Sequence, residues 1–186
     1  MYSPENFDIE IQLLIEAIYD KYSYDFRGYS MASVKRRLNS AMARYDFKTL
    51  ADLQERLVGD PSFFMTVLQY LTVPTSEMFR DPMYFKIIRE KVVPILKTYP
   101  SLKIWVAGCS TGEEVYSLAI LLKEEGLLDI TTIYATDINP VSLKKAEEGI
   151  YSSDKLKTYS SNYLHAGGTG NLADYFVMSY GAALFD

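Results

Sequence analysis

Apolar residues in the N-terminal part of the chain recur every three or four positions, which is the spacing of an amphipathic helix. Residues 5–22 carry one such apolar face, with polar residues opposite it, and residues 30–45 carry another. The two faces consist of Phe7, Ile11, Leu14, Ile18, Val34, Leu38, Ala41, Met42 and Tyr45. We therefore expect two helices here, each with one side packed in a core.

Two more helices are predicted from their end signals. Thr49 begins a sequence that resembles a capping box, and Gly59 ends the helix that follows. Asp60 before Pro61 is an N-cap with proline at the first helical position, and it opens a helix that reaches about Leu71. Four short helices with brief connections predict a small bundle.

The pattern changes at residue 102, where a short apolar run, 102–107, is typical of a parallel strand covered on both faces. Gly108 and Gly112 bracket a turn after it, because glycine lets the backbone turn sharply and lets a ligand come close. Apolar residues then return to helical spacing over 113–125. This is the order of a strand, a turn and a helix that often holds a nucleotide.

A second β-rich run covers residues 131–136 and ends in Asp137. Asn139 and Pro140 begin a helix that Gly149 ends. An acid at the tip of the second strand lies beside the first turn and can accept both hydroxyls of a ribose. The spacing therefore favours an adenosine-type ligand at the turn.

The segment between the bundle and the first strand contains residues 74–80, a connector of the kind that often faces a ligand, although an ordinary interdomain loop has the same pattern. Asp81 and Pro82 are expected to cap a helix that runs to about Tyr99, with a kink or break at Pro94.

The alternation of strands and helices weakens after Tyr151, and residues 165–171 are predicted to form a turn between two short extended pieces. Only two strands of a parallel sheet are convincing, whereas a stable doubly wound sheet has more. Either a C-terminal part is missing, or another chain completes the fold.

Composition limits the function classes. The 186 residues include 24 acidic and 19 basic side chains, and a net charge of −5 disfavours a general nucleic-acid binder. The single cysteine, Cys109, excludes an internal disulfide and fits a reducing compartment. With no signal peptide and no apolar segment of membrane-spanning length, a cytoplasmic location is expected.

Residues 30–45 are basic in an otherwise acidic chain, with Lys35, Arg36 and Arg37 in succession. The pattern is equally typical of a solvated helix face and of a docking surface for an acidic partner.

The turn at residues 108–112 is neither G-x-G-x-x-G nor a P-loop with its lysine. A pyrophosphate would meet Glu113 and Glu114 at the helix N-terminus and be repelled, which argues against an NAD-dependent enzyme. Two carboxylates suit a cationic ligand without phosphate, and S-adenosylmethionine has that chemistry. Glutamate in a first turn is also plain helix stabilisation.

Three segments, LTVPTSEMFRDPMYF (71–85), IWVAGCSTGEEVYSLAILL (104–122) and IYATDINPVSLKKAEEGIY (133–151), resemble the CheR-type chemotaxis receptor methyltransferases, which methylate glutamate side chains of chemoreceptors. The resemblance implies an α/β fold with an N-terminal helical domain at 1–73, a connector and linking helix at 74–100, and a partial, truncated Rossmann-like methyltransferase domain at 101–186. It also implies a small β subdomain near 160–186.

The resemblance assigns the cofactor, S-adenosylmethionine, with S-adenosylhomocysteine as product, and raises the docking interpretation of the basic segment for a chemoreceptor or similar signalling protein. No nucleic acid, membrane insertion or metal is expected. Together with the charge argument, it gives as candidate cofactor contacts Ser76, Arg80, Gly108, Gly112, Glu113, Glu114 and Asp137.

The reaction implied is direct methyl transfer to a glutamate carboxylate, with Arg80 as the candidate catalytic residue that orients it; a salt bridge from Arg80 to Asp81 or Glu77 is the plainer alternative. The family pattern is altered at Pro74, Ser76, Met78 and Val115, and its later Asn-Leu and Cys-Arg-Asn segments are absent. A non-catalytic partner-binding module therefore stays open as the alternative function.

Overall fold

The structure is a computed structural model that describes residues 4–72 and 76–185. Pro74 and Thr75 of the expected connector lie outside the described residues. The chain divides into two compact units, Met1–Val73 and Pro74–Asp186.

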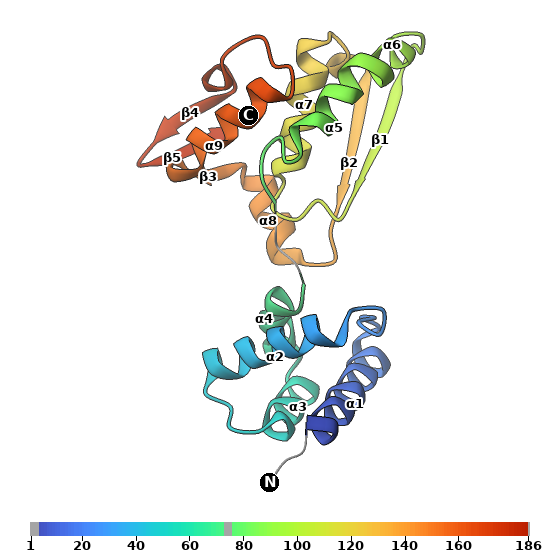
Figure 1. Cartoon of the computed structure of the whole chain (residues 1–186), viewed down its shortest axis with the longest axis vertical. Helices are drawn as coiled ribbons and strands as arrows, with labels where there is room; N and C mark the ends of the chain where they lie inside the picture. Colours follow the sequence, from blue (N-terminus) through green and yellow to red (C-terminus); the bar gives the residue numbers. More distant parts are fainter. Residues whose placement is uncertain (1–3, 73–75, 186) are drawn as a thin grey trace. The chain divides into compact units, whose positions relative to one another are not determined.

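The first unit is a bundle of α1 (Pro4–Tyr22), α2 (Met31–Tyr45), α3 (Leu50–Gly59) and α4 (Pro61–Leu71), as the apolar spacing predicts (Figure 1). Thr49 Oγ1 accepts from the backbone N–H of Asp52 at 3.1 Å, and the Asp60 carboxylate caps the first turn of α4. The fully buried side chains of this core include Ile11, Leu14, Leu38, Leu53, Leu57, Phe64 and Leu68.

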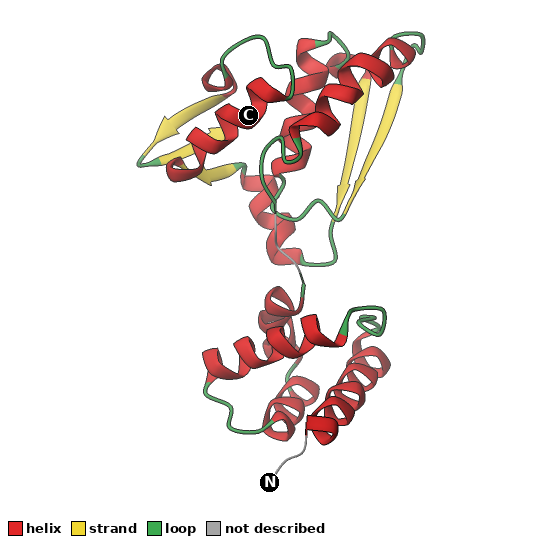
Figure 2. Cartoon of the chain, viewed as in Figure 1, coloured by secondary structure: helices red, strands yellow, loops and turns green. Residues whose placement is uncertain are grey.

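The second unit alternates strands and helices around two separate sheets (Figure 2). Its elements are α5 (Pro82–Ile87), η1 (Ile88–Val92), α6 (Val93–Leu96), β1 (Leu102–Ala107), α7 (Glu113–Glu124), η2 (Leu128–Ile130), β2 (Thr131–Thr136), α8 (Pro140–Glu148), β3 (Ile150–Ser152), η3 (Ser153–Lys155), α9 (Leu156–His165), η4 (Leu172–Tyr175), β4 (Phe176–Ser179) and β5 (Ala182–Phe185). Figure 1 shows α5, α7 and α9 between the two sheets.

The first sheet pairs β1 with β2 in parallel, from Leu102 opposite Thr131 to Ala107 opposite Thr136. The expectation that this strand is covered on both faces is wrong for the described residues. One face packs on the helices, whereas Trp105 on the other face is 69% exposed and its ring N–H donates to Thr136 Oγ1 at 2.9 Å.

The second sheet is antiparallel, with the order β3-β5-β4. It begins at Ile150, earlier in the chain than the β subdomain expected near residues 160–186. The expected extended piece before residues 165–171 is wrong, because Leu156–His165 is the helix α9, whose Tyr159 and Tyr163 are buried one turn apart.

The helix expected to reach about Tyr99 is interrupted as predicted, but the break spreads over more than Pro94. A π-helical turn, Ile88–Val92, precedes α6, in which Pro94 lies in the first turn. Proline has no N–H for the carbonyl one turn earlier, and widened turns are a common way to accommodate this.

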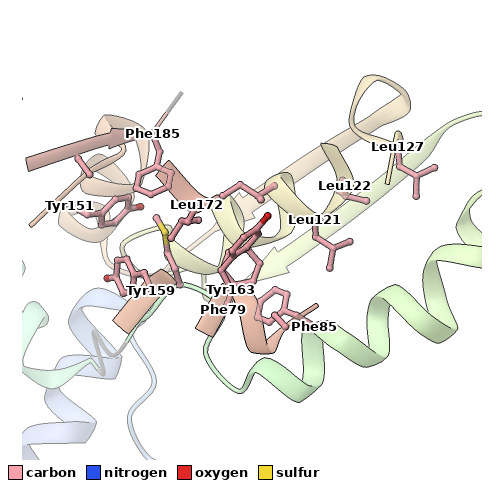
Figure 3. Packing of buried hydrophobic residues seen from close by; sticks show 14 of the residues in the cluster. Phe79, Phe85, Leu121, Leu122, Leu127, Tyr151, Tyr159, Tyr163, Leu172 and Phe185 are labelled. Atoms are coloured by element: carbon pink, nitrogen blue, oxygen red, sulfur yellow. The ribbon is translucent and has the colours of Figure 1, made fainter. Parts of the chain in front are cut away.

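One apolar core joins α5, α6, α7 and α9 with both sheets of the second unit (Figure 3). Phe79 packs edge-to-face on Phe85 and Tyr163, with ring centroids 5.2 and 5.3 Å away. Phe79 therefore anchors the segment at residues 76–81 against α5 and α9. Across residues 4–72 and 76–185, we find no helix with the length and apolarity needed to cross a membrane.

Candidate functional site

The turn between β1 and α7 is the centre of the site. Gly108 and Gly112 have φ values of 77° and 93°, and Ser110 between them has a φ of 51°. A Cβ on Gly112 would also lie 2.8 Å from Ala146 Cβ, so this position excludes any side chain without backbone movement. Glycine is required there for both conformation and space.

Asp137 lies directly beside this turn. Its Oδ2 accepts from the backbone N–H of Ser110 at 2.7 Å, and its Oδ1 accepts from the backbone N–H of Asn139 at 2.8 Å. The backbone N–H groups of Gly108 and Cys109 both donate to Thr136 O. The carboxyl end of β2 therefore holds the turn, and each Asp137 oxygen keeps a further lone pair for a ligand hydroxyl.

The two glutamates at the start of α7 have different surroundings. Glu113 is 1% exposed, and its carboxylate accepts from Thr111 Oγ1 at 2.6 Å and from the Tyr159 hydroxyl at 3.3 Å, with Lys155 Nζ 3.8 Å away. Glu114 is exposed. The expectation that both carboxylates face the ligand is corrected: consecutive helix residues point about 100° apart, and Glu113 points into the protein.

A cavity of about 370 Å³ lies at the carboxyl end of β1, within the size range of small-molecule sites. Of the predicted contacts, Ser76, Arg80, Gly108 and Glu114 line it, whereas Gly112, Glu113 and Asp137 do not. The other lining residues are Glu77, Asp81, Tyr84 and Phe85.

The wall of this cavity at residues 76–81 is held from two helices. The backbone N–H of Phe79 donates to Ser117 Oγ of α7 at 2.8 Å. Asn162 of α9 donates to Glu77 Oε1 and to Met78 O, at 3.2 and 3.1 Å. The segment is therefore fixed although two of its residues have positive φ values.

Phe79 and Asp81 have φ values of 51° and 54°. Such conformations cost free energy and persist where the surroundings fix them, often at functional sites. Asp81 occupies the N-cap position of α5, but the expected side-chain cap is wrong, since its side chain makes no cap hydrogen bond in this left-handed conformation.

Arg80 lies between these two strained residues. Its Nε is 3.7 Å from Asp81 Oδ2, so the plainer alternative of a salt bridge is present. The Arg80 and Asp81 side chains are 56% and 81% exposed, and an ion pair of that kind contributes little. Arg80 also lines the cavity.

Cys109 is buried in the turn. Burial raises the pKa of its thiol, and the nearby Asp137 carboxylate adds to the rise. The thiol stays protonated at neutral pH, which agrees with the expected packing role and not with a nucleophile.

The basic helix α2 does not present three equivalent cations. Lys35 Nζ is 2.9 Å from Asp8 Oδ1, and Arg37 donates to Leu71 O and Thr72 O at the end of α4. Arg36 is exposed. Of the three residues expected at a docking surface, Lys35 and Arg37 thus serve the bundle itself.

The sequence did not point to Glu77, Tyr84 or Phe85, which line the cavity, nor to Tyr151 and Tyr159, which contact the turn. The first three lie within five residues of Arg80 in the sequence, and this proximity is the only signal that could have found them. The two tyrosines reach the turn through tertiary packing.

Comparison with known families decides the relationship. The model described as "CheR methyltransferase, SAM binding domain" matches residues 74–172, and the one described as "CheR methyltransferase, all-alpha domain" matches residues 9–72. The chain belongs to the CheR methyltransferase family. The two matches of this CheR chain meet at the boundary between the two compact units, so the helical bundle is the all-α domain and the α/β unit is the SAM-binding methyltransferase domain.

Individual CheR relatives agree. A putative methyltransferase, Cher3, from Pseudomonas putida is 60% identical over 186 residues, which is 100% of this chain and 68% of that protein. Chemotaxis protein methyltransferases of Listeria innocua and Borreliella burgdorferi are 30% and 28% identical, over 72% and 79% of this chain. The chain spans only 52% and 56% of those two proteins.

Proposed function

We propose that this CheR-family chain takes part in S-adenosylmethionine-dependent methylation of glutamate carboxylates on a chemoreceptor or related signalling protein, in the cytoplasm. The observation that carries the proposal is that Glu114 of α7 and Arg80 of the segment before α5 line one cavity at the end of β1. The proposal is also supported by the match to the SAM-binding domain and by the names of the chemotaxis relatives.

The residues around the cavity fit the charges of this methyl donor. Glu114 offers an exposed carboxylate for the ammonium group of the methyl donor, and Arg80 places a guanidinium on the wall of the same cavity. Asp137, beside the turn, keeps acceptor lone pairs for ribose hydroxyls. Because Glu113 is buried, Glu114 is the one exposed carboxylate of the two at the N-terminus of α7. A single exposed carboxylate suffices to disfavour a phosphate there.

When bound, S-adenosylmethionine supplies an electrophilic methyl group on a positively charged sulfur. A substrate glutamate, with an ordinary pKa of about 4.3, is already a carboxylate at neutral pH and needs no general base. The work of the chain is then to orient the carboxylate and exclude water. We assign the orienting role to Arg80, whose backbone position is fixed by the buried Phe79.

Docking of the partner is assigned to α2. Arg36 and Arg44 are exposed on that helix, and its sequence has no acidic residue. An acidic helix surface of a receptor would complement them, and long-range attraction would raise the rate of encounter. This part of the proposal narrows the expected surface to Arg36 and Arg44, since Lys35 and Arg37 are engaged within the bundle.

Calorimetric titration of the chain with S-adenosylhomocysteine tests the cofactor assignment. We expect binding by the wild type, a loss of at least about tenfold in affinity for Glu114→Ala, and no loss for the control Glu147→Ala, which removes an exposed glutamate on α8. No binding by the wild type, or equal effects of both variants, would contradict the assignment.

Transfer of labelled methyl groups to a purified receptor fragment tests the enzymatic part. Binding of S-adenosylhomocysteine without methyl transfer by the chain would instead favour the alternative, a partner-binding module that does not turn over.

A further inference from the structure

The ligand-facing turn carries two unfavourable features at one residue. Ser110 has a φ of 51°, and its Oγ is buried without a hydrogen-bond partner among the residues described. A left-handed serine and an unpaired buried hydroxyl both cost free energy, and such features persist only where neighbouring groups fix the backbone. Asp137 fixes the turn from the side of the first sheet, through the Ser110 N–H.

The opposite side of the turn is fixed by two tyrosines. The Tyr151 hydroxyl donates to Thr111 O at 2.7 Å, and the Tyr159 hydroxyl donates to Glu113 at 3.3 Å. Thr111 Oγ1 donates to the same Glu113 carboxylate at 2.6 Å. Thr111 and Glu113 flank Gly112, so these bonds hold the last residues of the turn and the first residue of α7.

Both tyrosines belong to the part of the chain built on the second sheet. Tyr151 is in β3 and Tyr159 is in α9, and Figure 3 shows both rings in the core, with Phe185 of β5 next to Tyr151. The Tyr151 and Phe185 ring centroids are 5.7 Å apart. Burial raises the pKa of both tyrosine hydroxyls, so they remain protonated hydrogen-bond donors throughout the neutral range.

We infer that Tyr151, Tyr159 and Glu113 are positioning residues that couple the three-stranded sheet and α9 to the ligand turn at residues 108–112. The conformation of the turn, and with it the affinity of the cavity, depends on how this small sheet packs. Because such coupling is reciprocal, a ligand bound at the turn stabilises the packing of the small sheet by the same free energy that this packing contributes to ligand affinity. The ligand part of this inference rests on the function proposed above.

Amide hydrogen exchange tests the coupling without any ligand. Tyr151→Phe and Tyr159→Phe each remove one hydroxyl and keep the ring. We expect about tenfold faster exchange at the Cys109, Ser110 and Gly112 amides, which are hydrogen-bonded in the turn. Tyr163→Phe is the matched control, since this equally buried tyrosine of α9 donates instead to Glu124. It should leave turn exchange unchanged.

Equal turn exchange in Tyr151→Phe and Tyr163→Phe would overturn the inference. A general rise in exchange that includes the bundle helices in all three variants would also overturn it, because that result reports global destabilisation.

Calorimetry with S-adenosylhomocysteine tests whether these hydrogen bonds also affect ligand affinity. Loss of one supporting hydrogen bond should weaken binding by roughly fivefold in Tyr151→Phe and in Tyr159→Phe, and not in Tyr163→Phe. Faster turn exchange with unchanged affinity would overturn the coupling. A wild type that does not bind would count against the proposed function, and the exchange result would then decide the inference by itself.

Discussion

The backbone N–H of Phe79 donates a hydrogen bond to Ser117 Oγ at 2.8 Å, and this bond joins the wall of the cavity to α7. Ser117 is fully buried and donates in turn to Glu113 O at 2.6 Å. One hydroxyl thereby links the segment that carries Arg80 to the first turn of the helix that carries Glu114. The two charged groups assigned to the ligand are positioned through a single small side chain.

Ser117→Ala should lower the free energy of unfolding by about 1–3 kcal/mol, because it leaves the buried Phe79 N–H without an acceptor. Urea unfolding measures this. Ser161→Ala, an exposed serine on α9, should change stability by less than about 0.5 kcal/mol. If both variants behave alike, the bond does not hold the wall.

Substitution of Glu113 should lower the free energy of unfolding more than substitution of its neighbour Glu114. Glu113→Ala leaves the Thr111 and Tyr159 hydroxyls without their buried acceptor and should cost about 1–3 kcal/mol. Glu114→Ala should cost less than about 1 kcal/mol, the contribution of an exposed acid in a first turn. Unfolding curves of the two variants compare them directly, and the reverse order would contradict the orientation of the two side chains.

Cys109 should resist alkylation in the folded chain. Burial and the Asp137 carboxylate raise the pKa of its thiol, so at about pH 8 the thiolate fraction lies below that of an unhindered cysteine. Labelling with iodoacetamide should be slow in buffer, should accelerate as the pH rises towards the raised pKa, and should be fast in urea. Rapid labelling of the native chain near neutral pH would show an activated thiol instead.

Substitution of Arg37 should affect the stability of the bundle, whereas substitution of Arg36 should affect partner binding. Arg37→Ala removes bonds to two carbonyls at the end of α4 and should destabilise the bundle by about 1–2 kcal/mol, seen as faster hydrogen exchange in α2 and α4. Arg36→Ala should leave exchange unchanged and weaken binding to an acidic receptor fragment. A bundle that is unaffected by Arg37→Ala would return that residue to the docking surface.

The helices of the bundle and the strand-turn-helix order could be predicted because local signals and tertiary structure agree there. The spacing of Ile11, Leu14 and Leu38 and the cap at Asp60 all specify the same elements that the core requires. The acid at the end of the second strand was predicted for the same reason, since the parallel register alone places Asp137 beside the turn.

The rest depends on tertiary contacts that the sequence pattern does not contain. Periodicity could not distinguish the inward-facing Glu113 from the exposed Glu114. Two of the side chains that contact the Glu113 carboxylate, Tyr159 and Lys155, lie more than forty positions away in the sequence. The sequence pattern predicts an extended piece where the helix Leu156–His165 lies. The buried residues of this helix, Tyr159 and Tyr163, are aromatic, and aromatic residues are also frequent in strands. Polar residues that face inward are where local pattern reasoning fails.

The open face of β1 gives the molecule a built-in optical reporter. Trp105 is the single tryptophan of the chain, it is largely exposed, and its ring N–H bonds to Thr136, which immediately precedes Asp137. Its fluorescence therefore comes from one known place, three residues before Gly108 at the start of the turn. Anything that covers this face of the sheet will shift its emission to shorter wavelength and shield it from iodide.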